Sequence, residues 1–166
     1  MMVTNETRIE FRNYRSENFN DCLKVFEANT PNYFAQCERA EFISFLETQS
    51  DCYSTVWFRS AEDQNVIEQV GGFGIANAHN SAQGNLHWIM ILPRLQGQGI
   101  GVAIMNKVIE ETSKMQLDQL AIAASHLSAP FFERWGAKAQ NYTKHGWGEN
   151  MHRIDMLIDL AEHSSG

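Results

Sequence analysis

Two adjacent stretches, Leu86-His87-Trp88-Ile89-Met90-Ile91 and Gln96-Gly97-Gln98-Gly99-Ile100-Gly101, decide the fold of this chain. The first is rich in apolar and aromatic residues, which predicts a strand within a sheet. From residue 100 to residue 114, apolar side chains recur at helical spacing while lysines and glutamates take the opposite face, which predicts an amphipathic helix. The glycines between the two elements predict a tight turn from strand into helix.

A glycine turn at the start of a helix is suited to an anionic ligand, because the first N–H groups of a helix have no intrahelical partner. Glycine lets the backbone approach a phosphate closely, and the helix dipole favours negative charge. The alternative is a connection that needs glycine for steric reasons only. Two phosphate-binding motifs are excluded: a P-loop lysine is absent, and the GxGxxG of a Rossmann-type nucleotide-binding domain fails at Val102 and at Ile104.

Outward from this centre, hydrophobic periodicity predicts further elements. Residues 77–85 and 144–150 are polar or glycine-bearing and are expected to be loops. The expected strands are residues 9–14, 52–58, 66–75, 120–124, 137–142 and 152–158, and the expected helices are residues 18–29, 40–49 and 129–135. The order βααβββαβαββ predicts an α/β (mixed α+β) protein in which helices flank a mixed central sheet.

Composition limits the classes of function. The 166 residues fit one domain over 1–166, and 43% hydrophobic against 20% charged residues favour a packed core. Thirteen Lys plus Arg and twenty Asp plus Glu give a net charge of -7, which argues against nucleic acid or a membrane surface as partner. Without a signal peptide or a long apolar run, we expect a cytoplasmic protein. The cysteines, Cys22, Cys37 and Cys52, indicate neither a disulfide framework nor a metal site.

Two motifs resemble the GNAT superfamily of acetyl-CoA-dependent N-acetyltransferases. The acetyl-CoA signature of that family is Gln or Arg, two residues, Gly, one residue, then Gly or Ala; Gln96, Gly99 and Gly101 match it. The stretch APFFERWGA at residues 129–137 is similar to the family helix that ends in Tyr-Glu-Lys-x-Gly-Phe. With the element order, the resemblance covers residues 8–160 and implies a GNAT-like, mostly antiparallel central sheet flanked by helices.

The resemblance implies acetyl-CoA as cosubstrate and no metal. The pantetheine arm would lie in a splay between the strands that end at Ile91-Leu92 and at Ala124, and the N–H of Leu92 would stabilise the thioester oxygen. Ser125 stands where the family has asparagine and keeps one hydrogen bond to pantetheine. The pyrophosphate would bind backbone N–H groups of Gln96, Gly97, Gln98, Gly99, Ile100, Gly101 and Val102.

Phe132 departs from the family pattern, because relatives carry there a tyrosine that serves as general acid. Phenylalanine has no proton to give. Either the leaving thiolate is protonated by water or substrate, or Tyr142 replaces the missing acid, or the chain is a non-catalytic acyl-CoA-binding sensor. The main interpretation is an N-acetyltransferase that transfers acetyl to a primary amine of a small molecule or peptide by direct attack in a ternary complex, and the sensor is its alternative.

His87 is the candidate general base. Period-two alternation places Asn85, His87, Ile89 and Ile91 on one face of their strand. An imidazole with an ordinary pKa of about 6.5 suits proton removal from an ammonium. The alternative is a buried strand histidine satisfied by a neighbour. By resemblance, Asn85 takes the place where histone-type members carry glutamate and is a candidate for substrate binding.

Aromatic residues fall in the segments that, by resemblance, wall the acceptor site. Tyr33, Phe34, Tyr142 and Trp147 are expected to form an apolar or cation-binding pocket, with core packing as the alternative for Phe34. Arg153 is either a ligand for an acceptor carboxylate or an edge-strand arginine in solvent. The expected partners are therefore acetyl-CoA and an amine acceptor. Relatives often form a homodimer through the terminal strands, but no residue here specifies one.

Overall fold

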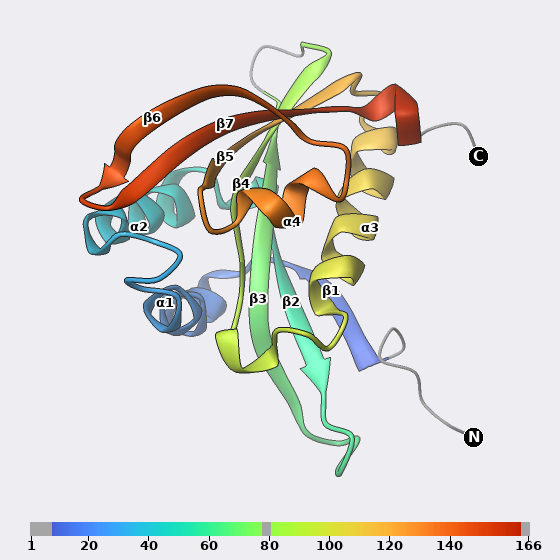
Figure 1. Cartoon of the computed structure of the whole chain (residues 1–166). Helices are drawn as coiled ribbons and strands as arrows, with labels where there is room; N and C mark the ends of the chain where they lie inside the picture. The colour runs from blue at the N-terminus through green and yellow to red at the C-terminus, as the bar shows by residue number, and fades with distance from the viewer. Residues whose placement is uncertain (1–7, 78–80, 164–166) are drawn as a thin grey trace.

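The chain folds around a seven-stranded sheet with strand order β1-β2-β3-β4-β5-β7-β6 (Figure 1). The computed structural model describes residues 8–77 and 81–163. The elements follow the predicted order: β1 (Ile9–Asn13), α1 (Phe19–Ala28), α2 (Arg39–Thr48), β2 (Tyr53–Arg59), β3 (Ile67–Ala76), β4 (Gln83–Ile91), α3 (Ile100–Lys114), β5 (Gln119–Ser125), α4 (Ala129–Glu133), β6 (Lys138–Gly148) and β7 (Met151–Asp159). The mixed α/β fold class is confirmed.

The strands β4 and β5 form the parallel pair of the sheet, whereas the other neighbouring pairs are antiparallel. Their pairing covers only Gln83–Leu86 against Gln119–Ile122. Beyond Leu86, β4 continues along β3, and β5 continues along β7 to Ser125. The two strands therefore separate toward their C-terminal ends and leave a gap in the middle of the sheet.

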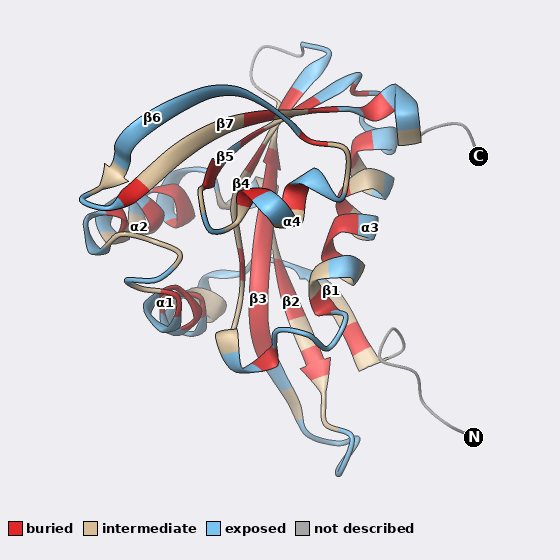
Figure 2. Cartoon of the chain, viewed as in Figure 1, coloured by how far each residue is buried: buried red, intermediate tan, exposed pale blue. Residues whose placement is uncertain are grey.

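Helices cover both faces of this sheet. The helices α3 and α4 contribute to one core, which includes Ile104, Met105 and Phe132, and the helices α1 and α2 form the other with Phe26 and Phe42. Figure 2 shows that β3 is buried along most of its length, as expected for a central strand covered on both sides. Among the described residues, the structure has no helix with the length and apolar character required to traverse a bilayer.

A bulge in β4 is held by the ring of Tyr53 on β2. Trp88 has a φ of 51°, and the register between β3 and β4 shifts opposite it, between Gly72 and Gly74. The buried Tyr53 hydroxyl donates a 2.9 Å hydrogen bond to the Trp88 carbonyl. A Cβ atom at Gly72 would lie 2.5 Å from the Tyr53 oxygen, so the ring reaches this position only because residue 72 is glycine.

This bulge makes the predicted shared face of Asn85, His87, Ile89 and Ile91 wrong. Ile89 and Ile91 pack against the core beneath α3, whereas the His87 ring lies 5.9 Å, centroid to centroid, from the Phe45 ring on α2. An extra residue in a strand shifts the alternation of side chains by one position. His87 therefore faces the layer of α1 and α2, and the two isoleucines face the opposite layer.

The hairpin of β6 and β7 is longer than the sequence predicts. The segment expected as a loop at 144–150 continues β6 to Gly148, and the chain turns at Glu149 and Asn150, whose φ is 61°. Figure 1 shows the hairpin arching over the sheet toward α2. The expected loop at 77–85 is also shorter, because β4 begins at Gln83; residues 78–80 lie outside the described part of the chain.

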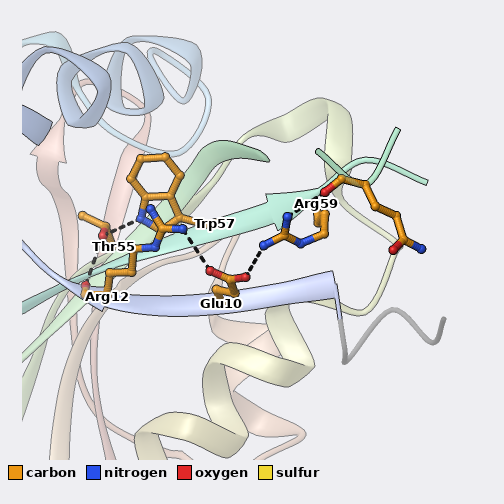
Figure 3. Close-up of polar contacts among 6 residues, drawn as sticks. Glu10, Arg12, Thr55, Trp57 and Arg59 are labelled. Carbon is orange, nitrogen blue, oxygen red and sulfur yellow. Dashed lines mark hydrogen bonds and ion pairs between the residues drawn. The ribbon is translucent and has the colours of Figure 1, made fainter. Parts of the chain in front are cut away.

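The edge strand β1 and its neighbour β2 carry a polar network (Figure 3). Glu10 accepts hydrogen bonds from Arg12 at 3.0 Å and from Arg59 at 2.5 Å, which hold the pKa of its carboxyl below the ordinary value. The Arg12 guanidinium lies 4.5 Å from the centroid of the Trp57 ring, and the indole N–H donates to Thr55 at 2.8 Å. Exposed ion pairs of this kind contribute at most about 1 kcal/mol each.

Candidate active site

A cavity of about 820 Å³ lies where β4 and β5 separate. Its volume is in the range of small-ligand sites in proteins. The cavity is lined by residues from the connection between α1 and α2, from both strands, from the glycine turn, from α4 and from the final hairpin. It brings together many of the predicted site residues: Tyr33, His87, Ile91, Gln96, Gly97, Gly99, Gly101, Val102, Ser125, Phe132 and Trp147.

Five predicted residues do not line this cavity: Asn85, Leu92, Gln98, Ile100 and Tyr142. Asn85 lies in the paired part of the sheet, opposite Ala76 and Ala121. The Ile100 side chain is buried in the core, so only its backbone is placed to serve a ligand. Tyr142 is 56% exposed on β6, with its ring against that of His152. The geometry therefore does not place Tyr142 as the replacement for the missing general acid.

The backbone of β4 corrects the predicted oxyanion donor. The N–H of Leu92 donates to the Val70 carbonyl at 2.8 Å and is therefore already used. Because successive residues of a strand point their polar groups to opposite sides, the N–H groups of Ile89 and Ile91 face the gap toward β5. The Ile91 carbonyl accepts a 3.0 Å bond from the buried Asn29 side chain, which ties the end of α1 to this edge.

The glycine turn forms an open backbone cradle. Gly97 and Gly99 both have a φ of 84°, and a Cβ atom at either position would meet no atom within 4 Å. The helix α3 begins with the bond from the Ala103 N–H to the Gly99 carbonyl at 3.0 Å, so the N–H groups of 100–102 have no intrahelical partner. Tyr33 donates a 3.3 Å bond to the Gln96 side chain. The cradle can therefore receive an anion between backbone donors.

We expect Gly99→Ala to weaken acetyl-CoA binding about tenfold or more, because the added methyl group enters the space that a phosphate would need and the left-handed backbone becomes strained. Isothermal titration calorimetry measures the dissociation constant. Gly136→Ala is the matched control: its φ is 88°, it lies outside the cavity, and it carries the same backbone strain. An equal loss of affinity in both variants would contradict the cradle.

Ser125 and Phe132 have structural roles beside the cavity. The Ser125 N–H donates to the Ser128 hydroxyl at 3.0 Å, and the Ser128 N–H donates back to the Ser125 hydroxyl at 3.2 Å. This reciprocal pair fixes the turn that leads into α4. Phe132 is 3% exposed and belongs to the core beneath α3 and α4, with one side on the cavity.

Glu38 also lines the cavity, although the sequence patterns do not predict it. It ends the short 3-10 turn Gln36–Glu38 and is 4% exposed. Burial raises the pKa of its carboxyl to about 7, although a 2.7 Å hydrogen bond from the Ala35 N–H acts in the opposite direction. No motif or periodicity marks this glutamate among its polar neighbours, because its burial depends on contacts distant in the chain.

The end of the final hairpin lies beside the segment that carries Glu38 and forms another part of the cavity wall. The Trp147 indole donates a 3.0 Å bond to the Ala124 carbonyl at the end of β5. The Arg153 guanidinium lies 4.8 Å from the centroid of the Trp147 ring, and its Nε donates to Asp155 at 2.9 Å. A Cβ atom at Gly146 would lie 2.5 Å from the Arg153 Cβ, so this packing requires glycine. The hairpin therefore places one guanidinium at a fixed point of the cavity wall.

His87 lies between two openings. It lines the cavity, and with Trp88 it also lines an open depression along α2. Burial lowers the pKa of its imidazole below the ordinary 6.5. A neutral imidazole at neutral pH can accept a proton, and the depression gives it a way to pass that proton to solvent.

Three histidines gather outside the cavity, at the end of the hairpin. The ring centroids of His126 and His145 lie 4.9 and 5.0 Å from that of His152. The Nδ1 atom of each ring accepts a hydrogen bond from a backbone N–H group. The donor to His126 is His152, the donor to His145 is Asn150, and the donor to His152 is His145. Within residues 8–77 and 81–163, no three His, Cys, Asp or Glu side chains are arranged to hold a metal ion.

We expect the pKa of His152 to lie below 6.5, because of desolvation and the neighbouring charges of His126, His145 and Lys144. Because the pKa of His152 is lower in the folded than in the unfolded state, its neutral ring contributes fully to the free energy of unfolding above pH 6.5. This contribution is lost as the pH falls through the folded-state pKa. NMR titration of the ring protons measures the pKa. His152→Asn keeps a hydrogen-bond acceptor but does not titrate, so the free energy of unfolding of this variant should fall less on acidification than that of the wild type. An equal fall in both proteins would contradict this role of His152.

The sequence matches the model of the acetyltransferase (GNAT) family over residues 21–137. Over 83 residues it is 29% identical to GCN5-related N-acetyltransferase 3, chloroplastic, of Arabidopsis thaliana. That match covers 46% of this chain and 35% of the relative, so it spans about a third of the relative's length.

Solved structures show the same fold. The chain is similar to Ard1 from Thermoplasma volcanium with a TM-score of 0.72 at 9% identity, covering 92% of this chain and 97% of that one. It is also similar to a phosphinothricin acetyltransferase from Sinorhizobium meliloti in complex with AcCoA, with a TM-score of 0.69 at 16% identity, covering 96% and 92%. Because the family model spans most of the chain, the protein belongs to the acetyltransferase (GNAT) family.

Proposed function

We propose that the protein transfers the acetyl group of acetyl-CoA to a primary amine of a small molecule or peptide by direct attack in a ternary complex. The observation that carries this proposal is the cavity between β4 and β5, which is lined by the glycine cradle, His87 and Glu38 together. The GNAT family uses acetyl-CoA. A passage through the sheet lets a thioester and an amine meet from opposite sides.

On the coenzyme side, the backbone N–H groups of residues 97–102 bind the pyrophosphate, with Gly97 and Gly99 giving it close access. The predicted donor Gln96 is not among them, because its N–H is bonded to the Pro93 carbonyl at 3.2 Å. The pantetheine arm lies along the edge that β4 leaves unpaired. The N–H of Ile89, beside the bulge, then stabilises the negative charge that develops on the thioester oxygen. This assignment replaces Leu92, whose N–H is bonded to Val70.

On the acceptor side, His87 removes a proton from the ammonium, directly or through water. The amine nitrogen then attacks the thioester carbon, the carbon–sulfur bond breaks, and an amide and the CoA thiolate are formed. The thiolate takes its proton from water or from the nitrogen of the product, because Phe132 has none to give. The open depression beside His87 allows the imidazole to release its proton to solvent.

The proposal is tested by thiol release from acetyl-CoA with polyamines, arylalkylamines, amino acids, aminoglycosides and peptide amino termini as acceptors. We expect one class to be acetylated, with 1:1 formation of thiol and amide. Phe132→Tyr, which restores the hydroxyl of the family, should change the rate of this reaction and not create it. Tight acetyl-CoA binding without any turnover, together with turnover gained in Phe132→Tyr, would replace the proposal by an acyl-CoA sensor.

A further inference from the structure

We infer that the acceptor is an amine that also carries a carboxylate, such as an amino acid, and that Arg153 binds the carboxylate while Glu38 binds the ammonium. The inference rests on the proposed acetyl transfer and specifies the class of acceptor. Its basis is that Glu38 and Arg153, which line one cavity and carry opposite charges, are not paired with each other. Glu41 and Arg134 also line the cavity.

Arg153 is positioned as a receptor for an anion. Its Nε is held by Asp155 and its plane lies over the Trp147 ring, while Gly146 leaves the space that this arrangement requires. In the described part of the chain, its two terminal nitrogens make no hydrogen bond or ion pair. A guanidinium presents a planar fork of donors that matches both oxygens of a carboxylate. The side chain lines the cavity, so this fork is accessible to an acceptor.

Glu38 supplies the complementary charge. The positive charge of Arg153 lowers the pKa of the Glu38 carboxyl, whereas burial raises it. The two side chains nevertheless form no ion pair with each other. One carboxylate oxygen accepts the Ala35 N–H, and a buried carboxylate needs further partners to remain charged. An ammonium provides them and favours the ionised form. The space between Glu38 and Arg153 therefore suits a molecule with both charges.

Other acceptor classes fit this wall less well. A polyamine or a simple monoamine can use Glu38, but it offers no carboxylate to the unpaired guanidinium of Arg153 and brings further positive charge toward it. The Trp147 ring has Arg153 over it, so that face is not available as a cage for a cationic ligand. The only other arginine that lines the cavity is Arg134, which lies over Phe131 after α4 on the coenzyme side, among the residues described.

The test compares kcat/KM for two amino acids, L-methionine and L-phenylalanine, with kcat/KM for two sets of analogues. The α-carboxamides replace the carboxylate by a neutral amide, and the amines 3-methylthiopropylamine and phenethylamine lack it altogether. We expect the amino acids to be preferred about a hundredfold or more, because a buried polar group without its partner is costly. Arg153→Gln should bring this ratio close to one without raising the KM for acetyl-CoA. Arg153→Lys, which keeps the charge but not the fork, should be intermediate. Glu38→Gln should lower the rate with acids and amides alike.

Arg134→Gln is the matched control and should leave the acid-to-amide ratio unchanged. Equal rates on acids and amides in the wild type, an equal loss on both in Arg153→Gln, or a raised KM for acetyl-CoA in that variant would overturn the inference. If no acceptor is acetylated, calorimetry of L-methionine binding to the protein with CoA separates the two claims. Binding that is lost in Arg153→Gln supports the inference while the proposed function fails; no binding overturns the inference as well.

Discussion

Replacement of His87 by alanine is expected to lower kcat for amine acetylation by about 10²- to 10⁴-fold, the usual contribution of a positioned general base. The KM for acetyl-CoA should change little, because the imidazole lies against the Phe45 ring on α2 and the coenzyme cradle is formed by the backbone of the glycine turn. Steady-state thiol release measures both constants. His87→Gln, which keeps a polar side chain of similar size without accepting the proton, should be equally impaired.

The pH dependence distinguishes His87 from Glu38 as the base. Burial lowers the pKa of His87, so a rate that needs its neutral form should fall only below pH 6.5. Burial raises the pKa of Glu38 to about 7, so kcat/KM would begin to fall near pH 7 if Glu38 were the base. The acid limb of kcat/KM should therefore lie below pH 6.5 and disappear in His87→Ala. A limb near pH 7 that survives in this variant and is lost in Glu38→Gln would assign the base to Glu38.

Gly72→Ala is expected to reduce the free energy of unfolding by about 2–4 kcal/mol, which is a large effect for one methyl group. Its Cβ would lie 2.5 Å from the Tyr53 oxygen and 2.7 Å from ring atoms, and this ring is fully enclosed. Moving the ring would also break its bond to the Trp88 carbonyl, which holds the bulge of β4. Urea denaturation measures the change.

Gly74→Ala in the same strand is the control for Gly72→Ala. Its Cβ would meet ring atoms of Phe45 and Tyr53 at 3.2 Å, a contact that a small shift relieves. We expect a loss clearly smaller than that of Gly72→Ala. Equal losses would show that the Tyr53 ring moves freely, and the account of the bulge would then fail.

The features that the sequence predicts well are local. The helix α3 runs over the predicted residues, Ile100–Lys114, because its apolar period and the glycine turn before it lie within one continuous segment. The order of elements is confirmed for the same reason, since each strand or helix carries its own periodicity. The gap between β4 and β5 was implied by the family resemblance and is present in the strand register.

The predictions that failed depend on contacts between distant segments. The bulge at Trp88 is fixed by a hydroxyl from β2, and residue 88 is neither glycine nor proline, so nothing in β4 itself signals it. The N–H of Leu92 is already hydrogen-bonded, because the pairing of β4 with β3 places the Val70 carbonyl opposite it. Tyr142 is exposed because β6 is an edge strand of the sheet.

The acceptor wall has the same non-local origin. The strand β6 extends to Gly148, and the hairpin carries Trp147 and Arg153 over to the segment between α1 and α2. There the Cys37 sulfur lies 3.7 Å from the Trp147 carbonyl, and the buried Glu38 follows directly. Periodicity within either segment does not reveal that the two charged residues share a cavity.

The most direct test of the central claim is a crystal structure of the protein with acetyl-CoA. We expect the pyrophosphate within hydrogen-bond distance of the N–H groups of residues 97–102, and the thioester in the gap between β4 and β5 beside Ile89 and His87. Acetyl-CoA bound on another surface, with this gap filled by side chains, would contradict the assignment of the site.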